Sequence, residues 1–451
     1  MKPFPTQITG ALFLESRKYA LLADQPRVGK TGAAIMASDM ALDATTLVVT
    51  TASGRPVWER GFRAWSKLPR RTQVLAGDAL DANADTVIVG WPQVAKPAVR
   101  AALLRRPWAR VILDESHYAK NFEAKRTEAV YGTPERDGEG LFSRTAITGS
   151  AGGVWCLTGT PLPNSPADLY PMMRALCPER LSAGYGSADT PDVTKAGDFL
   201  HRYCVVRMKK IGRGFRKIPV VIGGRNLDEL NARLDGFWMR RTQADVGIRE
   251  PIHELMPLAV PPRVRRALDA ESEAGKILAA AESGSTREME MHLGPLRRIT
   301  GELKAPLIVK ALEDEFECGL DKIVVMAWHR ETMRILAEGL QKYGVVGIDG
   351  STPAKDRATA EDRFRDPAGP RVFIGQIQAA GEAIDLSAAS ELIFAETSFV
   401  PKDMAQASLR VTNLTANRLC RVRVAVLEGS IDEASQQILM RKWTAIREVL
   451  K

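Results

Sequence analysis

Several features are scarce in this sequence, and each absence narrows the class of protein. No apolar run approaches the roughly 18 residues needed to span a bilayer. The opening MKPFPTQITG also lacks the charged-then-apolar pattern of a secretory signal. Only five cysteines occur in 451 residues, without any Cys-x-x-Cys pair, which argues against a zinc site or a disulfide framework. We therefore expect a cytoplasmic protein whose cysteines fill its core.

Length and composition favour a globular chain with two cores. With 45% hydrophobic and 26% charged residues and neither internal repeats nor long low-complexity tracts, 451 residues suit two α/β domains. A formal charge of +9 and a pI near 9.3 favour a polyanionic partner, although such a charge also serves solubility. The compact length fits a bacterial or phage origin.

Short apolar runs that fit buried parallel strands recur with helix-like segments between them. The runs are TLVVT (46–50), TVIVG (86–90), RVILD (110–114), VWCLTG (154–159), KIVVMA (322–327), VVGIDG (345–350), RVFIG (371–375), ELIFA (391–395) and VRVAVL (422–427). Between about 165 and 320 the rhythm lapses, and helix-like and basic segments dominate. Two separate parallel sheets explain this pattern best.

The proline-bearing stretch LMPLAVPPR (255–263) marks the expected boundary between the domains. We predict a first domain over 1–257, with a helical and basic insertion at about 165–250. The second domain is predicted over 258–451 and begins with a helical segment to about 320.

The sharpest local signal is LLADQPRVGKT, an apolar strand followed by a turn and the alanine-rich segment GAAIMASDMAL. This is the context of a phosphate-binding loop, in which loop amides around Gly29 hold phosphate, Lys30 neutralises its charge and Thr31 binds magnesium. The usual glycine five residues before Gly29 is replaced by Asp24. Because Gly-Lys-Thr also occurs at ordinary helix starts, other motifs must decide.

A second motif, VILDESHYAKN, places Asp114 and Glu115 directly after an apolar strand, at the sheet edge where ligands of α/β folds bind. Asp114 is expected to hold magnesium through water, and Glu115 to orient and deprotonate the attacking water. His117 would couple this site to the neighbouring motif. An N-terminal helix cap would explain the same letters, but the phosphate-binding pattern upstream favours the catalytic interpretation.

The order of these segments along the chain resembles that in the Swi/Snf-type translocases of the second helicase superfamily. Within that family, the resemblance is to the HARP-like annealing helicases. LLADQPRVGKT is similar to that family's LADEMGLGKT, DESHYAKN to its DEAH-type box, and CLTGTPLPNSPADLY to its LTGTP-x-x-N-x-x-x-DLY. FWMRRTQADV resembles the arginine pair that closes the first domain, and RITGELKAPLI the helix that opens the second. Four later segments look like motifs four to six: MAWHRETMRILAEGL, DGSTPAKDRATAEDRF, QIQAAGEAIDLSAASELIFAE and QASLR.

The resemblance implies an α/β fold of two tandem RecA-like P-loop domains, parallel sheets flanked by helices, with helical insertions between them. It further implies an ATP-dependent translocase on double-stranded or branched DNA. The translocase would be powered by hydrolysis of ATP, with Mg²⁺, in the cleft between the domains. We expect a monomer with no membrane partner.

Site residues carry over where the motifs match. Gln7 in PFPTQITGA matches the glutamine that reads adenine, whose donor and acceptor can pair with the base. A third motif would couple the state of the bound nucleotide to the strength of DNA binding, through the hydroxyl groups that it carries. It consists of Thr158, Gly159 and Thr160. In the second domain the resemblance assigns Gly381 and Asp385 to the fifth motif and Gln406 and Arg410 to the sixth, with Arg410 as the arginine finger.

Two departures from the family bear on turnover. The sixth motif usually has a second arginine three residues after the first, but Asn413 stands there, and asparagine carries no charge. Arg410 then suffices, or Arg418 or Arg421 substitutes, or hydrolysis is weak. The fifth motif is also altered, at positions 382, 383 and 385.

The basic segment RMKKIGRGFRK (207–217) is the candidate contact to the DNA backbone, although a charge run is usually a solvated loop. The residues that it would use are Arg207, Lys209, Lys210, Arg213, Arg216 and Lys217.

Two other functions stay open. A strand-separating DNA or RNA helicase shares every ATP-site residue, and a weakly hydrolysing nucleotide-dependent DNA-binding protein would explain the altered motifs. A P-loop kinase would leave the second sheet unexplained.

Overall fold

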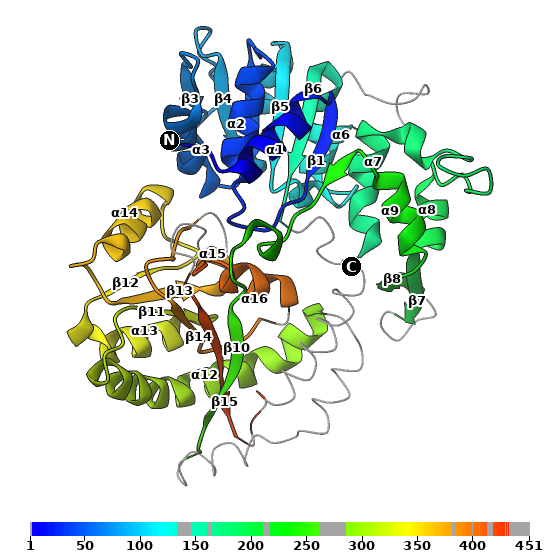
Figure 1. Ribbon diagram of the computed structural model, residues 1–451. Helices are drawn as coiled ribbons and strands as arrows, with labels where there is room; N and C mark the ends of the chain where they lie inside the picture. Colours follow the sequence, from blue (N-terminus) through cyan, green and yellow to red (C-terminus); the bar gives the residue numbers. More distant parts are fainter. Residues whose placement is uncertain are drawn as a thin grey trace. The chain divides into compact units, whose positions relative to one another are not determined.

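The computed structural model describes residues 2–132, 146–159, 165–210, 217–260, 286–380, 384–398, 400–412 and 418–428, with 430 and 432. They fall into two compact units, the first ending at Thr242 and the second beginning at Gln243 (Figure 1). Among the helices of these segments, none has the length and apolar character needed to cross a membrane.

A seven-stranded, wholly parallel sheet forms the centre of the first unit, in the order β3-β4-β2-β5-β6-β1-β9. The strands are β1 (Tyr19–Leu22), β2 (Thr46–Thr50), β3 (Thr72–Val74), β4 (Thr86–Gly90), β5 (Trp108–Asp114), β6 (Ala151–Leu157) and β9 (Trp238–Met239). Both faces of the sheet are covered, since Leu47 and Val49 of β2 point into one hydrophobic core and Val48 into another. Burial on both faces is why these strands read as continuous apolar runs.

Helices flank this sheet and complete the two cores. They are α1 (Pro5–Glu15), α2 (Lys30–Met40), α3 (Gly54–Trp65), α4 (Trp91–Val94), α5 (Pro97–Leu104), α6 (Lys125–Tyr131), α7 (Tyr170–Leu176), α8 (Ala196–Tyr203) and α9 (Leu227–Leu234). The first three share one core with Trp155 of β6, whereas α5 to α9 pack in the other.

The insertion after β6 contains an element that the sequence did not predict. Besides helices, it holds an antiparallel hairpin of β7 (Cys204–Lys210) and β8 (Lys217–Gly224). Three apolar side chains of β7 are exposed, namely Val205, Val206 and Met208. The expected loop 207–217 is therefore partly strand.

The second unit is built on a six-stranded parallel sheet in the order β10-β15-β14-β11-β13-β12. Its strands are β10 (Ile252–Leu258), β11 (Ile323–Ala327), β12 (Val345–Ile348), β13 (Val372–Gln376), β14 (Glu391–Phe394) and β15 (Arg421–Leu427). The described helices are α12 (Thr286–Glu317), α13 (Arg330–Gly339), α14 (Ala354–Arg365), α15 (Ile377–Ala380) and α16 (Pro401–Ser408) (Figure 1). Val324 and Val325 of β11 point into different cores, so helices cover both faces here too.

The predicted fold class, two tandem RecA-like α/β units with parallel sheets, is confirmed, and all nine predicted strands are present. The expected boundary at 257 is wrong in position, because β10 pairs along its whole length with β15 of the second sheet. The first unit instead ends at Thr242. Four cysteines are buried as expected, but Cys318 is exposed.

Candidate functional site

The predicted phosphate loop lies between β1 and α2 of the first unit. Gly29 has φ 102°, a left-handed conformation, and a Cβ there would lie 2.7 Å from Cγ of Gln7. Glycine is therefore favoured at this position for two reasons: the backbone is left-handed, and a Cβ would collide with the side chain of Gln7. Lys30 is the first residue of α2, and its Nζ donates to the carbonyl oxygens of Asp24 at 2.6 Å and Gln25 at 3.2 Å. Thr31 follows it in the first turn of the helix.

The structure brings Gln7 to this loop, although 21 residues separate the two in sequence. Gln7 lies on α1 and is only 5% exposed. Its Oε1 accepts the backbone N–H of Phe4 at 3.0 Å, which orients the carboxamide. A Cβ placed on either Gly29 or Gly32 would lie 2.8 Å from Nε2 of Gln7. The side chain predicted to contact adenine therefore lies directly against the predicted phosphate loop.

Asp114 and Glu115 lie at the carboxyl end of β5, as predicted. Two donors hold Oδ2 of Asp114: Oγ1 of Thr50 at 2.7 Å and Nε1 of Trp58 at 2.8 Å. Burial, together with the charge of Glu115, raises the pKa of the Asp114 carboxyl to about 6, although these two hydrogen bonds and Lys30 oppose the rise. Thr50 and Trp58 are site residues that sequence reasoning missed.

The donor set fits a magnesium ion. Both donors to Asp114 contact Oδ2, so Oδ1 is the oxygen that can face a cation. A carboxylate and a threonine hydroxyl, completed by water and phosphate oxygens, are the ligands that Mg²⁺ takes in nucleotide sites. In the described segments no group of three or more His, Cys, Asp or Glu side chains could hold a metal by itself. The chain therefore offers a partial magnesium shell.

Glu115, His117 and Thr158 form one contact cluster. Glu115 has φ 50°, an uncommon left-handed conformation for a non-glycine residue. Nδ1 of His117 lies 2.9 Å from Oγ1 of Thr158 and 3.2 Å from Oε2 of Glu115. The ends of β5 and β6 are thus joined through side chains, as a coupling role requires.

The motif after β6 also touches the phosphate loop. A Cβ on Gly159 would lie 2.9 Å from Cδ of Pro26, so the two backbones approach closely. Thr160 lies outside the described residues.

Trp91 is a packing residue. It is 1% exposed, stacks on Tyr118 and donates from Nε1 to the carbonyl oxygen of Asp114 at 2.9 Å. It therefore supports the carboxyl end of β5 from inside the fold.

In the second unit, Gln406 on α16 and Arg410 just after it are buried, with 4% and 7% exposure. Asp385 accepts both the N–H and the hydroxyl of Ser387 through Oδ1. The carbonyl oxygen of Arg410 accepts the N–H of Leu386, so the fifth and sixth motifs lie side by side. Gly381 and Asn413 lie outside the described residues.

Four of the six predicted DNA-contacting residues lie on the β7–β8 hairpin. Arg207 is exposed on β7. Lys209 and Lys210 end β7 and Lys217 begins β8, whereas Arg213 and Arg216 lie outside the described residues. The backbone thus brings both basic ends together, as expected for paired strands.

Residues 7–190 match the SNF2-related domain, and residues 308–415 match the helicase conserved C-terminal domain. The chain is 26% identical to the mouse protein named DNA annealing helicase and endonuclease ZRANB3, over 98% of this chain and 40% of that protein. It is 27% identical to a Xenopus tropicalis protein named SWI/SNF-related matrix-associated actin-dependent regulator of chromatin subfamily A-like protein 1, over 99% and 44%. The chain spans less than half the length of these two relatives.

Among solved structures, the Sulfolobus solfataricus SWI2/SNF2 ATPase core in complex with dsDNA is 19% identical, with a TM-score of 0.45 over 100% of this chain and 93% of that one. The two domain matches occur in the order that the motifs predicted, one in each unit. The chain therefore combines an SNF2-related domain with a helicase conserved C-terminal domain.

Proposed function

We propose that this protein is an ATP-dependent translocase on double-stranded DNA that hydrolyses ATP to ADP and phosphate. The observation that carries the proposal is the gathering, at one edge of the first sheet, of the Lys30 loop, Asp114 with Glu115, and the His117–Thr158 pair. This combination pairs a phosphate-binding loop with a base beside it and links both to a neighbouring motif.

ATP is proposed to bind with its adenine against Gln7 and its phosphates on the amides that precede α2. Lys30 would exchange its two carbonyl partners for β and γ phosphate oxygens, since a lysine ammonium has three donors to redistribute. Thr31 and Asp114 would hold Mg²⁺. When bound, the ion neutralises charge on the transferred phosphoryl group.

Glu115 is the proposed base. Its carboxylate lies beside His117, and a water held by Glu115 would lose its proton to this carboxylate as it attacks the terminal phosphate. Arg410 is proposed as the cation that neutralises the developing charge, and Gly381, Asp385 and Gln406 as further nucleotide-binding residues, as the family resemblance implies.

Movement along a duplex needs contacts with the phosphate backbone more than with bases. We assign these contacts to the basic segment 207–217, that is, to Arg207, Lys209, Lys210, Arg213, Arg216 and Lys217. Coupling runs through Thr158, Gly159 and Thr160. The name of the mouse relative, DNA annealing helicase and endonuclease, supports DNA as the substrate, and the family resemblance favours double-stranded or branched DNA.

The test is the steady-state ATPase rate with duplex DNA, forked DNA, single strands and RNA at two salt concentrations. We expect duplex-containing DNA to stimulate most, and less at high salt, because binding to phosphates releases counterions. Greater stimulation by single strands or RNA would favour a strand-separating helicase. Binding of ATP without stimulated turnover would favour a weakly hydrolysing DNA-binding protein.

A substitution of Lys30 tests whether this loop binds the phosphates of ATP. Lys30→Ala should remove ATP binding and hydrolysis, because the charge on the phosphates loses its partner. Unchanged activity in this variant would show that the phosphates bind elsewhere.

A further inference from the structure

The front of the phosphate loop is held by a buried ion pair. Asp24 stands where the general loop pattern has glycine, and its side chain is 1% exposed. Arg241 donates to both of its oxygens, from Nε to Oδ1 at 3.0 Å and from Nη2 to Oδ2. This two-pronged geometry fixes direction as well as distance. At the position where other phosphate loops have a flexible glycine, this chain has an aspartate whose side chain is held in place by Arg241.

Arg241 also holds the segment that carries Gln7. Its Nη1 donates to the carbonyl oxygen of Thr6 at 2.6 Å, one residue before Gln7. Room for the guanidinium comes from Gly10 on α1, where a Cβ would lie 2.9 Å from Nη2. One guanidinium therefore ties the loop to the helix that bears the proposed adenine contact.

The backbone reinforces the same connection. The N–H of Ala23 donates to the carbonyl oxygen of Met239 at 2.7 Å, and that of Gln25 to the carbonyl oxygen of Arg241 at 2.9 Å. Strand pairing between β1 and β9 thus continues into the loop. The carbonyl oxygen of Asp24 in turn accepts Nζ of Lys30. Arg241 consequently fixes a residue that touches the phosphate-binding lysine directly.

We propose that Arg241 is a positioning residue for the nucleotide. By clamping Asp24 it sets the shape of the phosphate loop, and through Thr6 it sets the place of Gln7, so that ATP affinity depends on the Asp24–Arg241 pair. Loop amides bind phosphate well only if they converge before the ligand arrives, because ordering them on binding lowers affinity. The inference rests on the proposed function in one respect, that the Lys30 loop holds the phosphates.

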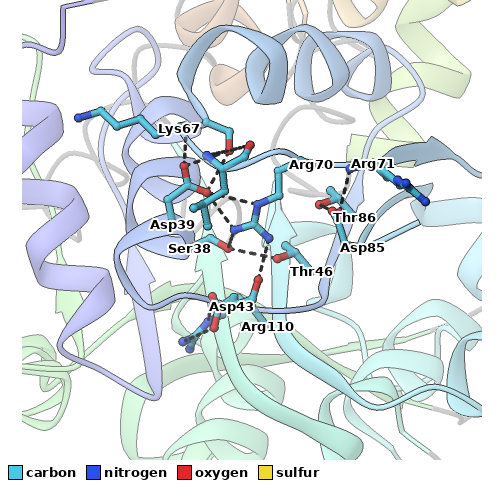
Figure 2. Close-up of polar contacts among 12 residues, drawn as sticks. Ser38, Asp39, Asp43, Thr46, Lys67, Arg70, Arg71, Asp85, Thr86 and Arg110 are labelled. Atoms are coloured by element: carbon cyan, nitrogen blue, oxygen red, sulfur yellow. Dashed lines mark hydrogen bonds and ion pairs between the residues drawn. The ribbon is translucent and has the colours of Figure 1, made fainter. Parts of the chain in front are cut away.

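The same unit contains a matched control pair far from the loop. Arg110 donates to Asp43 through Nε at 3.0 Å and Nη2 at 3.3 Å, and this pair is also largely buried. Figure 2 shows it in a network with Arg70 and Asp39, around the start of β2 and the end of α2. Parallel strands begin at this edge, whereas the nucleotide motifs follow strand ends at the opposite edge. Loss of the control pair should therefore affect stability without affecting the nucleotide.

The experiment measures ADP binding with Mg²⁺ by titration calorimetry on the full chain. The first variant is Asp24→Asn with Arg241→Met, which removes both charges together and leaves no unpaired buried charge. The control is Asp43→Asn with Arg110→Met. We expect the Kd for ADP to rise about tenfold in the first variant, the lower end of the loss seen when residues that orient metal ligands are removed. The control should match the unaltered protein. An unchanged Kd in the first variant, or an equal rise in both, would overturn the proposal.

A single substitution guards against a variant that does not fold. Arg241→Lys keeps the positive charge but loses the planar fork. We expect weaker ADP binding and a raised KM for ATP with a smaller change in kcat, whereas unchanged binding would refute the positioning role. Lys30→Ala separates this inference from the proposed function. If it abolishes binding while both Arg241 variants bind normally, only the clamp proposal fails.

Discussion

Nδ1 of His117 lies 2.9 Å from Oγ1 of Thr158, which joins the end of β5 to the end of β6. The same hydroxyl lies 3.5 Å from Oε2 of Glu115. Because the proposed base and the proposed coupling motif share these contacts, a change in one has a direct route to the other.

The first prediction concerns Thr158→Val, which keeps side-chain volume and removes the hydroxyl. We expect basal ATPase activity to stay within about twofold, while stimulation by duplex DNA falls about tenfold, a loss within the usual range of coupling free energies. ATPase rates with and without DNA measure both. Thr158→Ser is the control, since it restores the hydroxyl and should restore stimulation. Equal loss of basal and stimulated rates would argue that Thr158 serves the chemical step instead.

A second prediction concerns Glu115→Gln. The amide keeps the shape of the side chain but accepts protons poorly, so hydrolysis should fall at least about a hundredfold while ATP still binds. Single-turnover hydrolysis and equilibrium ATP binding separate the two effects. Normal turnover would place the general base elsewhere.

The third prediction follows from the pKa of Asp114, about 6 against an ordinary value of 3.8. The fold disfavours the charged carboxylate, so this residue's destabilising contribution builds up as pH rises from about 4 to about 6 and is complete above that. In EDTA, Asp114→Asn should therefore raise the free energy of unfolding by about 2 kcal/mol at neutral pH, and by much less near pH 4. Urea unfolding at the two pH values measures the difference. Destabilisation at neutral pH would contradict the argument, and ATPase activity should be lost regardless.

The sequence predicts the strands well where they are central in a parallel sheet, because Thr46–Thr50 and its counterparts must be apolar on both faces. It misplaces the domain boundary because β10 is an edge strand, largely exposed and containing Pro257, so no apolar run marks it. The β7–β8 hairpin is missed for a related reason. Its Lys- and Gly-rich centre reads as a loop, and the apolar side chains of β7 face solvent.

The residues of the candidate site likewise divide into those that the sequence predicts and those that it does not. Lys30 and Asp114 follow from local spacing, since Lys30 begins the helix after the loop that follows β1 and Asp114 ends the apolar strand β5. Thr50 could also have been found, because it ends TLVVT at the same sheet edge as Asp114. Trp58 could not, because its contact depends on how a helix packs. Arg241 belongs to the arginine pair of FWMRRTQADV that the sequence marks, but its contact with Asp24 depends on how distant segments pack. The roles of Asp385, Gln406 and Arg410 stay predictions, as does the bacterial or phage origin.

A fourth prediction tests the altered sixth motif. Asn413→Arg restores the second arginine that the family pattern has, and if that motif limits turnover the DNA-stimulated kcat should rise by about tenfold or more, a modest share of what arginine fingers contribute in related NTPases. Steady-state ATPase measurements give the answer. No gain would mean that Arg410, or another arginine such as Arg418, already fills the role. Asn413→Gln, which adds length without charge, is the control.

The last prediction concerns the end of α2, away from the nucleotide. The N–H of Leu42 donates to Asp39 O and that of Asp43 to Ser38 O, the two bonds that close a helix with a left-handed residue. Leu42 is that residue, with φ 54°, and its side chain is 74% exposed. Leucine is strained in this conformation and glycine is not, so Leu42→Gly should raise the free energy of unfolding by about 1 kcal/mol after allowance for the more flexible unfolded chain. Leu42→Ala is the matched control, because it removes the exposed side chain and keeps the strain. A similar gain in both variants, measured by urea unfolding, would show that the exposed side chain rather than the backbone causes the instability.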